Sequence, residues 1–199
     1  NKLDRAVEAE SLYRDVYQAR REVLGAQHYA TLISLNNLAV QLRRLGQFAQ
    51  SEPLQRQAYE GLQKTIGVHD PRSVQTGLNV VQDLIPQGKF EAAQHLLESL
   101  LGDVRQHGKQ QVVALALRLF GQSLQGQGKL DAAEQSYEQS WQAAKAIKNT
   151  DEQRETAQAA ANLHDKAGAG AAKSTIWQQR LQELSSRPGE TPKPAKADS

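Results

Sequence analysis

The chain has 199 residues, of which 24 are basic and 22 are acidic, so its formal net charge is only +2. The charges are scattered without a long basic block, which argues against a nucleic-acid-binding surface. The chain contains no cysteine, which excludes disulfides, thiol catalysis and cysteine-ligated metal ions. No stretch reaches the roughly 18 apolar residues that a membrane-spanning helix needs, so no direct membrane insertion is expected.

The compartment is not specified by the sequence. A chain without cysteine suits either an oxidising or a reducing environment. The chain begins at Asn1 and contains no methionine, so we expect a piece of a longer protein or a processed form. No signal-peptide pattern opens it. We expect a soluble domain, with the cytoplasm favoured over other compartments.

Helical periodicity dominates from one end of the chain to the other. Apolar residues recur at three- and four-residue steps and no segment alternates convincingly at period two, which predicts an all-α protein. Glycines and polar clusters divide the chain into about nine helical segments. We expect these helices at about residues 4–24, 29–45, 47–66, 71–87, 89–107, 110–126, 129–148, 151–167 and 171–186.

Local signals mark several helix ends. Asp70 followed by Pro71 supplies an N-cap and a proline at the first helical position. The segment from Thr150 to Gln153 has the pattern of a capping box. Gly46 is expected to end the helix over 29–45, because glycine tolerates a positive φ.

The same pattern recurs along the chain with a period near 42 residues. Gly46-Gln47-Phe48, Gly88-Lys89-Phe90 and Gly128-Lys129-Leu130 follow one another at steps of 42 and 40 residues. A fixed period of this length is typical of a solenoid, whose function usually lies in its surface. We expect one solenoid over residues 1–186, with about four repeats of which the first lacks its first helix. A disordered tail rich in Pro, Lys and Ser is expected over 187–199.

The helix pairs resemble tetratricopeptide repeats (TPRs), in which a first helix A packs on a second helix B. Leu35-Asn36-Asn37-Leu38-Ala39 resembles the helix A core of the kinesin-light-chain type, whose repeats exceed the usual 34 residues. The run from Gly25 to Thr31 resembles that type's Gly-x-x-His-Pro-x-Thr linker, with Tyr29 in place of proline. The resemblance implies a right-handed α-solenoid of antiparallel helix pairs, a TPR superhelix. It also implies a non-catalytic scaffold for protein–protein interaction.

The resemblance further implies where a ligand would bind. In the family, helix A lines the concave face of the superhelix, and the third residue of the core points into the groove. Here that position holds Asn37, then Asn79, and then Leu119, so the ladder of asparagines ends after two repeats. We expect the groove to bind an extended peptide, uncharged or mildly acidic, or a partner protein. The candidate groove residues are Asn36, Asn37, Val40, Arg44, Asn79, Gln82, Arg118 and Gln122.

Several alternatives stay open at this stage. The amides could be solvated groove residues without a dedicated ligand. The chain could be a regulatory or sensor region of a larger signalling protein, such as a bacterial kinase, or a self-assembly element. The first helix has the helix B pattern with no helix A before it. Leu3, Ala6 and Leu12 are therefore expected to expose apolar surface, through which the chain could self-associate.

No catalytic site, metal site or cofactor is expected. The histidines lack an i, i+4 partner and a carboxylate at ligand spacing in the sequence, and no Ser/His/Asp motif is present. His28 and His69 are expected to serve loop or capping geometry. Trp141 and Trp177 are expected to pack in the core rather than to form a docking surface.

Overall fold

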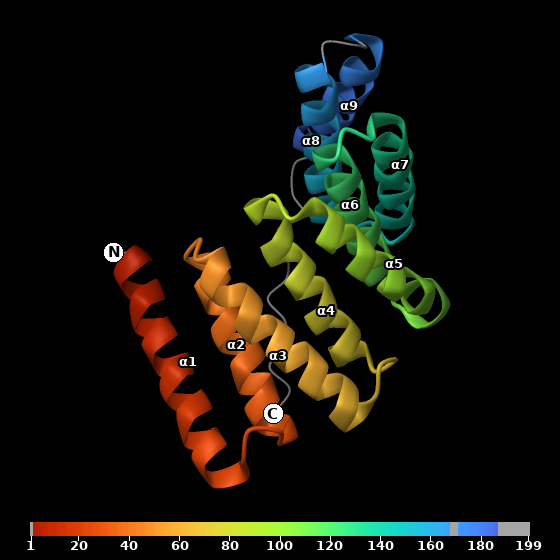
Figure 1. Cartoon of the computed structure of the whole chain (residues 1–199). Coiled ribbons are helices and arrows are strands. Elements are labelled where there is room, and N and C mark those ends of the chain that lie inside the picture. Colours follow the sequence, from red (N-terminus) through yellow and green to blue (C-terminus); the bar gives the residue numbers. More distant parts are fainter. Residues whose placement is uncertain (1, 168–170, 187–199) are drawn as a thin grey trace.

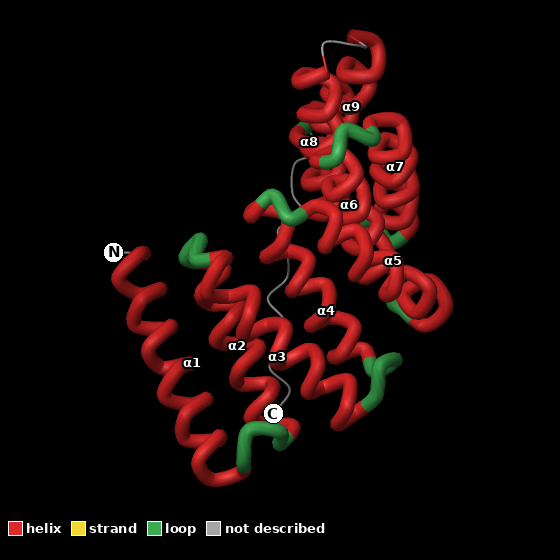
Figure 2. Tube along the Cα trace, in the orientation of Figure 1, coloured by secondary structure: helices red, strands yellow, loops and turns green. Residues whose placement is uncertain are grey.

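The computed structural model describes residues 2–167 and 171–186, and the side chains within 7–163 and 175–186. The tail expected at 187–199 and the side chains of Leu3 and Ala6 lie outside these described residues. The described part contains only helices and loops (Figures 1 and 2). The helices are α1 (Lys2–Leu24), α2 (Tyr29–Arg44), α3 (Phe48–Ile66), α4 (Pro71–Leu84), η1 (Ile85–Gln87), α5 (Phe90–His107), α6 (Gln110–Gly126), α7 (Leu130–Ala146), α8 (Thr150–Ala167) and α9 (Ala171–Ser185).

Consecutive helices pack side by side along the whole array. Each helix contacts mainly the helix before it and the helix after it, and Figure 1 shows the resulting curved row. The pairs α2–α3, α4–α5, α6–α7 and α8–α9 each join a helix A to a helix B, and α1 packs against α2. The predicted all-α solenoid is thereby confirmed.

The turns between the paired helices repeat in geometry as well as in sequence. Gly46, Gly88 and Gly128 have φ values of +75°, +72° and +76°, a region that residues with a Cβ rarely adopt. Neighbouring repeats are also joined by equivalent hydrogen bonds. Gln87 Nε2 donates to the carbonyl of Phe48, and Gln127 Nε2 donates to that of Phe90, each over 3.4 Å.

The end of α4 differs from the prediction. A single helix was expected over 71–87, but α4 ends at Leu84 and residues 85–87 form one turn of 3₁₀ helix. Pro86 accounts for the change, because proline has no N–H to donate and its ring crowds the carbonyl four residues earlier. The α-helical hydrogen bonding therefore stops just before it.

Two of the expected caps form, and one does not. Asp70 Oδ1 accepts a hydrogen bond of 2.9 Å from the Arg72 N–H, and His28 Nδ1 accepts one of 3.2 Å from the Ala30 N–H. The capping box at Thr150 is wrong. Asn149 caps α8 instead, because its Oδ1 accepts from the Glu152 N–H over 3.2 Å, and Gln153 Nε2 donates to an earlier carbonyl, that of Ala144.

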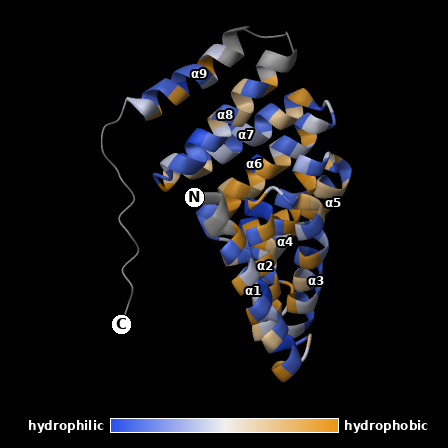
Figure 3. Cartoon of the chain, turned by 90° about the vertical axis from the view of Figure 1, so that its left-hand side faces the viewer, coloured by the Kyte–Doolittle hydropathy of each residue, from blue (hydrophilic) through white to orange (hydrophobic). Residues whose placement is uncertain are grey.

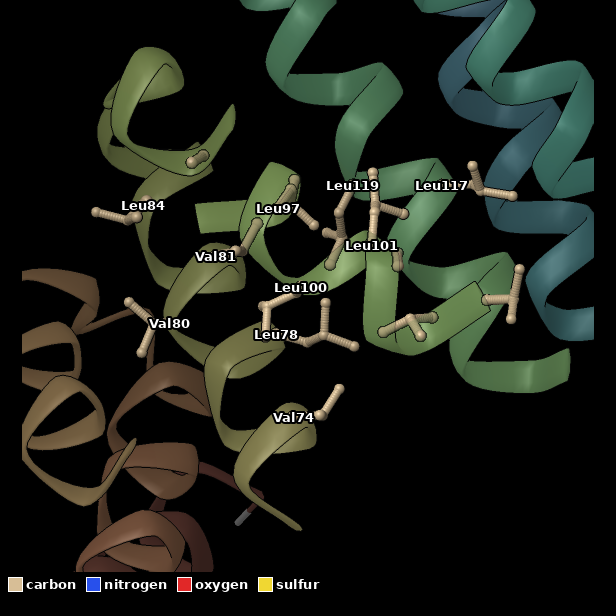
Figure 4. Close-up of a cluster of buried hydrophobic side chains, with 14 of the residues drawn as sticks. Val74, Leu78, Val80, Val81, Leu84, Leu97, Leu100, Leu101, Leu117 and Leu119 are labelled. Carbon is tan, nitrogen blue, oxygen red and sulfur yellow. The ribbon is translucent and has the colours of Figure 1, made fainter. Parts of the chain in front are cut away.

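Buried apolar side chains run along the array from α2 onward, and two clusters of them lie in its later helices. The first lies among α4, α5 and α6 (Figure 4), and the second lies among α6, α7, α8 and α9. Trp141 and Trp177 are both buried in the second cluster, as expected, with ring centroids 6.0 Å apart in an edge-to-face arrangement. The guanidinium of Arg180 lies 4.9 Å from the centroid of Trp141 and 4.2 Å from that of Trp177, distances that favour cation–π attraction.

Some helices approach each other through glycine. A Cβ added at Gly121 of α6 would lie 2.6 Å from Cε1 of Tyr137, which is a fully buried residue of α7. A Cβ at Gly77 of α4 would lie 2.9 Å from Cε2 of Tyr59 in α3. These glycines have ordinary helical φ values, so space rather than backbone conformation explains the residue at each position.

We expect Gly121→Ala to lower the free energy of unfolding by about 1–3 kcal/mol, because the added methyl group overpacks against Tyr137. Gly102→Ala is the matched control, since Gly102 lies within α5 with no atom within 4 Å of an added Cβ. The control should be neutral or stabilising by up to about 1 kcal/mol, because alanine favours helix. Thermal and urea unfolding of both variants measures the difference. Equal effects would contradict the close packing at Gly121.

Candidate functional site

A groove runs along the helices that occupy the A position. It has a volume of about 520 Å³ and is lined by residues of α2, α4, η1, α6 and α8. These elements come from four successive repeats, so the groove exists only because the repeats stack. The lining residues are Arg43, Gln82, Ile85, Pro86, Leu115, Arg118, Leu119, Gln122, Glu152 and Glu155.

Three of the eight candidate residues line this groove, namely Gln82, Arg118 and Gln122. Gln82 and Gln122 occupy equivalent positions of α4 and α6 and are half-buried. Within the described part of the chain, neither side-chain amide makes a hydrogen bond. Each can therefore both donate to and accept from a ligand.

The other five candidates lie outside the groove lining. Asn37 and Arg44 are exposed on α2, and Val40 is half-buried there. Asn36 is half-buried, and Asn79 is buried with 7 % of its surface exposed. The predicted row of asparagines, Asn37 and Asn79, therefore lies outside the groove lining, whereas Gln82 and Gln122 are part of it.

Asn36 and Asn79 join α2 to α4 through their side chains. Asn36 Oδ1 accepts from Asn79 Nδ2 over 3.1 Å and from Gln55 Nε2 over 2.6 Å. Arg43 Nη1 in turn donates to the Asn79 carbonyl over 3.2 Å. The bonds of Asn79 with Asn36 and Arg43 join consecutive repeats, and the bond of Asn36 with Gln55 joins α2 to α3 within one repeat, so the two asparagines serve the packing of the solenoid.

A buried carboxyl group lies behind this network. Asp83 of α4 has no exposed surface, and its Oδ2 accepts a hydrogen bond of 2.7 Å from the Ser51 hydroxyl. Its Oδ1 has no hydrogen-bond partner and lies 3.9 Å from Arg43 Nη1. Burial raises the pKa of Asp83 to about 6, although the Ser51 hydrogen bond and the charge of Arg43 act in the opposite direction.

Arg118 is occupied by two carboxylates from the next repeat. Its Nε lies 2.5 Å from Glu152 Oε1, and its Nη2 lies 2.6 Å from Glu155 Oε2. The side chains of Arg118 and Glu152 are nearly buried, whereas 60 % of the Glu155 side chain is exposed. Arg118 therefore links α6 to α8, and the carboxylates of Glu152 and Glu155 neutralise its charge within the chain itself.

Sequence reasoning missed several groove residues. Arg43 lines the groove, whereas its neighbour Arg44, the candidate residue, is exposed and lies outside the lining. Ile85 and Leu115, which the sequence analysis did not name, supply an apolar floor together with Leu119, which it placed at the third position of the core. The repeat register could have located Ile85, since it lies 42 residues after Arg43.

His69 also makes a contact that its local sequence does not show. Its Nδ1 lies 2.9 Å from Asp103 Oδ1, a carboxylate on the neighbouring helix B, α5. His69 therefore contacts α5 and does not cap α4, the role that Asp70 fills. Within the described residues, no group of three His, Cys, Asp or Glu side chains is arranged to hold a metal ion.

Comparison with known proteins identifies the repeats. Residues 1–64 match the family described as tetratricopeptide repeat. No curated protein matches the chain in sequence. Among the described residues, no helix is both long enough and apolar enough to cross a membrane.

Solved structures share the fold over nearly the whole chain. The nearly identical TPR-like repeats of a Podosopora anserina protein described as a kinesin light chain are 15 % identical, with a TM-score of 0.75 over 96 % of this chain and 92 % of that one. BtubC (BKLC) from P. vanneervenii is 18 % identical, with a TM-score of 0.77 over 100 % and 80 %. A Rap protein complexed with Competence and Sporulation Factor is 17 % identical, with a TM-score of 0.77 over 92 % and 50 %.

The fold and the groove define a helical-repeat solenoid of the kind that generally mediates protein–protein interactions. More particularly, the first 64 residues match the tetratricopeptide repeat family, and solved structures of TPR-like repeats share the fold of nearly the whole chain. Such folds are typically non-catalytic scaffolds.

The raised pKa of Asp83 predicts how stability depends on pH. Asp83 titrates near pH 6 in the folded chain and near its ordinary value of 3.8 in the unfolded chain. Its protonation therefore stabilises the fold fully below about pH 4, and this contribution is lost as the pH rises through about 6. Asp83→Asn keeps the shape of the side chain without the buried charge, and should be more stable than the wild type at pH 7.5 by about 1–3 kcal/mol.

Thermal unfolding at pH 7.5 and pH 5 measures this effect. The advantage of Asp83→Asn over the wild type should shrink at the lower pH, where the wild-type carboxyl group is largely protonated. Asp15→Asn, which alters an exposed carboxylate of α1, is the control and should show no such change. A constant difference between Asp83→Asn and the wild type at both pH values would argue against a buried, ionised Asp83.

Proposed function

We propose that this chain is a non-catalytic interaction module that binds an extended peptide or a partner protein in the groove along α2, α4, α6 and α8. The observation that carries the proposal is the pair of unpartnered amides, Gln82 and Gln122, beside the apolar floor of the groove. An amide that both donates and accepts can hold a peptide backbone without regard to the side-chain sequence.

The spacing of the two glutamines suits an extended chain. They lie at equivalent positions on adjacent A helices, and packed helices are about 8–10 Å apart. An extended chain advances about 3.3 Å per residue, so the backbone groups of every third peptide residue would meet successive amides. Apolar peptide side chains between these points would face Leu115 and Leu119.

The charges of the groove favour an uncharged segment. Arg118 already pairs with Glu152 and Glu155, so it offers little attraction to an acidic peptide or a terminal carboxylate. Arg43 is held by the Asn79 carbonyl and lies near Asp83. The expectation of an uncharged ligand is thus better supported than that of a mildly acidic one.

Two further roles remain candidates. A regulatory or sensor region of a larger signalling protein would use the same groove, and the Rap protein of similar fold was solved in complex with a factor. Self-assembly is supported by a different observation, the exposure of Leu12 and Val16 on α1. Sedimentation over a range of concentrations would show whether the chain associates with itself.

The groove is tested with a phage-displayed library of random 12-residue peptides. Enriched peptides should bind the wild-type chain, and Gln82→Ala combined with Gln122→Ala should weaken them about 30-fold, since two hydrogen bonds of roughly 1 kcal/mol each are lost. Gln57→Ala combined with Gln106→Ala is the control, because both glutamines are exposed on B helices. The control should bind as the wild type does. Equal binding by all three proteins, or no enriched peptide, would count against a peptide groove.

A further inference from the structure

The groove along α2, α4, α6 and α8 has more acidic than basic groups once the carboxyl group behind it is counted. Its lining contains two arginines and two glutamates, Arg43, Arg118, Glu152 and Glu155. Buried Asp83 adds a third carboxyl group, whose Oδ1 lies 3.9 Å from Arg43 Nη1. Asp83 is largely ionised at pH 7.5, because burial raises its pKa only to about 6. Three negative charges therefore stand against two positive ones.

The surplus negative charge is accessible at Glu155. Arg118 binds the two glutamates through different nitrogen atoms, at 2.5 Å from Glu152 Oε1 and 2.6 Å from Glu155 Oε2. The Glu152 side chain is only 10 % exposed, whereas that of Glu155 is 60 % exposed. In the part of the chain that the structure describes, the other oxygen of Glu155, Oε1, makes no hydrogen bond or ion pair. A ligand can therefore reach this carboxylate without displacing Arg118.

Other charges of α8 do not change this balance. Asp151 and Arg154 are the remaining charged residues in the first half of the helix. Arg154 Nη1 lies 3.2 Å from Asp151 Oδ1, so the two pair with each other and add no net charge. Neither of them lines the groove.

Glu155 places a charge where neighbouring repeats have none. Helix α6 begins at Gln110 and α8 at Thr150, so a shift of 40 residues aligns them and places Glu155 on Leu115. The step of 40 residues between turn glycines places Leu115 in turn on Gln75 of α4. Figure 3 shows the same change along the array, since α6 is rich in hydrophobic residues and α8 is more hydrophilic. The apolar floor of the groove is thus followed on α8 by an acid.

The positions of Leu115 and Glu155 define a spacing in the ligand. Both line the groove, at equivalent places on α6 and α8, and these two helices contact each other directly. Packed helices are about 8–10 Å apart. A peptide in the polyproline II conformation rises about 3.1 Å per residue with three residues per turn, so its side chains three positions apart share one face and lie about 9 Å apart. The side chains that face Leu115 and Glu155 are therefore three positions apart.

We propose that the groove selects peptides with a Lys or Arg three positions away from a bulky apolar residue, the basic side chain facing Glu155 and the apolar one facing Leu115. This inference rests on the proposed function of the groove and adds the chemical class of its ligand. Opposite charges across an interface steer association and fix register, so Glu155 determines specificity. The rest of the peptide is uncharged, because Arg43 and Arg118 already have carboxyl groups beside them.

Selection from the phage-displayed library of random 12-residue peptides tests the pattern on the full chain. Peptides enriched on the wild type should have Lys or Arg three positions from an apolar residue, in either chain direction, more often than the unselected library. Glu155→Gln should still enrich peptides but without this bias, and Glu155→Lys should favour Asp or Glu instead. Glu60→Gln, at an exposed position of helix α3, is the control and should keep the wild-type bias.

Fluorescence anisotropy with one enriched peptide measures the size of the effect. Replacing its Lys or Arg by Gln should weaken binding to the wild type about threefold, the size expected for an exposed ion pair. The same replacement should not change binding to Glu155→Gln. Circular dichroism checks the fold of the variants, in which Glu152 still binds Arg118.

The outcomes separate this inference from the groove itself. Enriched peptides that lack the basic bias on the wild type, or that keep it on Glu155→Gln, would overturn the inference and leave the peptide groove standing. Peptides that bind equally well after Gln82→Ala and Gln122→Ala are combined would place the basic contact outside the groove and overturn the inference as well. A library that yields no enriched peptide would overturn both the inference and the proposed function.

Discussion

The distance between neighbouring helices depends on places where a glycine faces a bulky side chain across a helix contact. Gly61 lies against Leu32, Gly77 against Tyr59, and Gly121 against Tyr137. Protein interiors are close-packed, so each of these contacts fixes a local separation. In a solenoid every helix contacts only its neighbours, and local separations and angles therefore accumulate into the curvature of the array. The groove is a product of this packing.

Polar side-chain contacts help to fix how consecutive repeats pack against each other. Asn36 binds Asn79 across α2 and α4, and Arg118 binds Glu152 across α6 and α8. Bonds of this kind have directions, whereas apolar contacts tolerate sliding of one helix along another. The same contacts withdraw Asn36, Asn79 and Arg118 from ligand binding. Gln82 and Gln122 line the groove, and neither makes a side-chain hydrogen bond to the residues that the structure describes.

Much of the fold could be predicted because its signals are local and repeated. The period of 42 residues, the turn glycines and the apolar stripes each indicated the same helices. The errors concerned the ends of two helices, α4 and α8, where a single residue decides the outcome against the pattern of its neighbours. Pro86 stops α-helical bonding two residues before the turn at Gly88, and Asn149 takes the cap that Thr150 could have supplied.

The groove was harder to predict because it depends on distant partners. The register predicted Gln82, Arg118 and Gln122 as groove residues, and all three line the groove, since equivalent residues of stacked repeats align; their part in ligand binding stays a prediction. It could not show that Glu152 and Glu155 balance the charge of Arg118, because those residues lie more than 30 positions along the chain. The burial of Asp83 was equally invisible, since an aspartate on a predicted helix is normally placed in solvent.

The two tryptophans of this chain are neighbours in space, and this has an optical consequence. Trp141 and Trp177 report the docking of α9 against α7, with Arg180 beside both rings. Their fluorescence is therefore a local probe of the last repeats and carries no signal from α1 to α4. Circular dichroism records every helix equally. In a solenoid each helix contacts mainly its neighbours, so the two ends can unfold at different temperatures. The difference between the midpoint followed by tryptophan fluorescence and the midpoint followed by circular dichroism therefore measures how independently the two ends unfold.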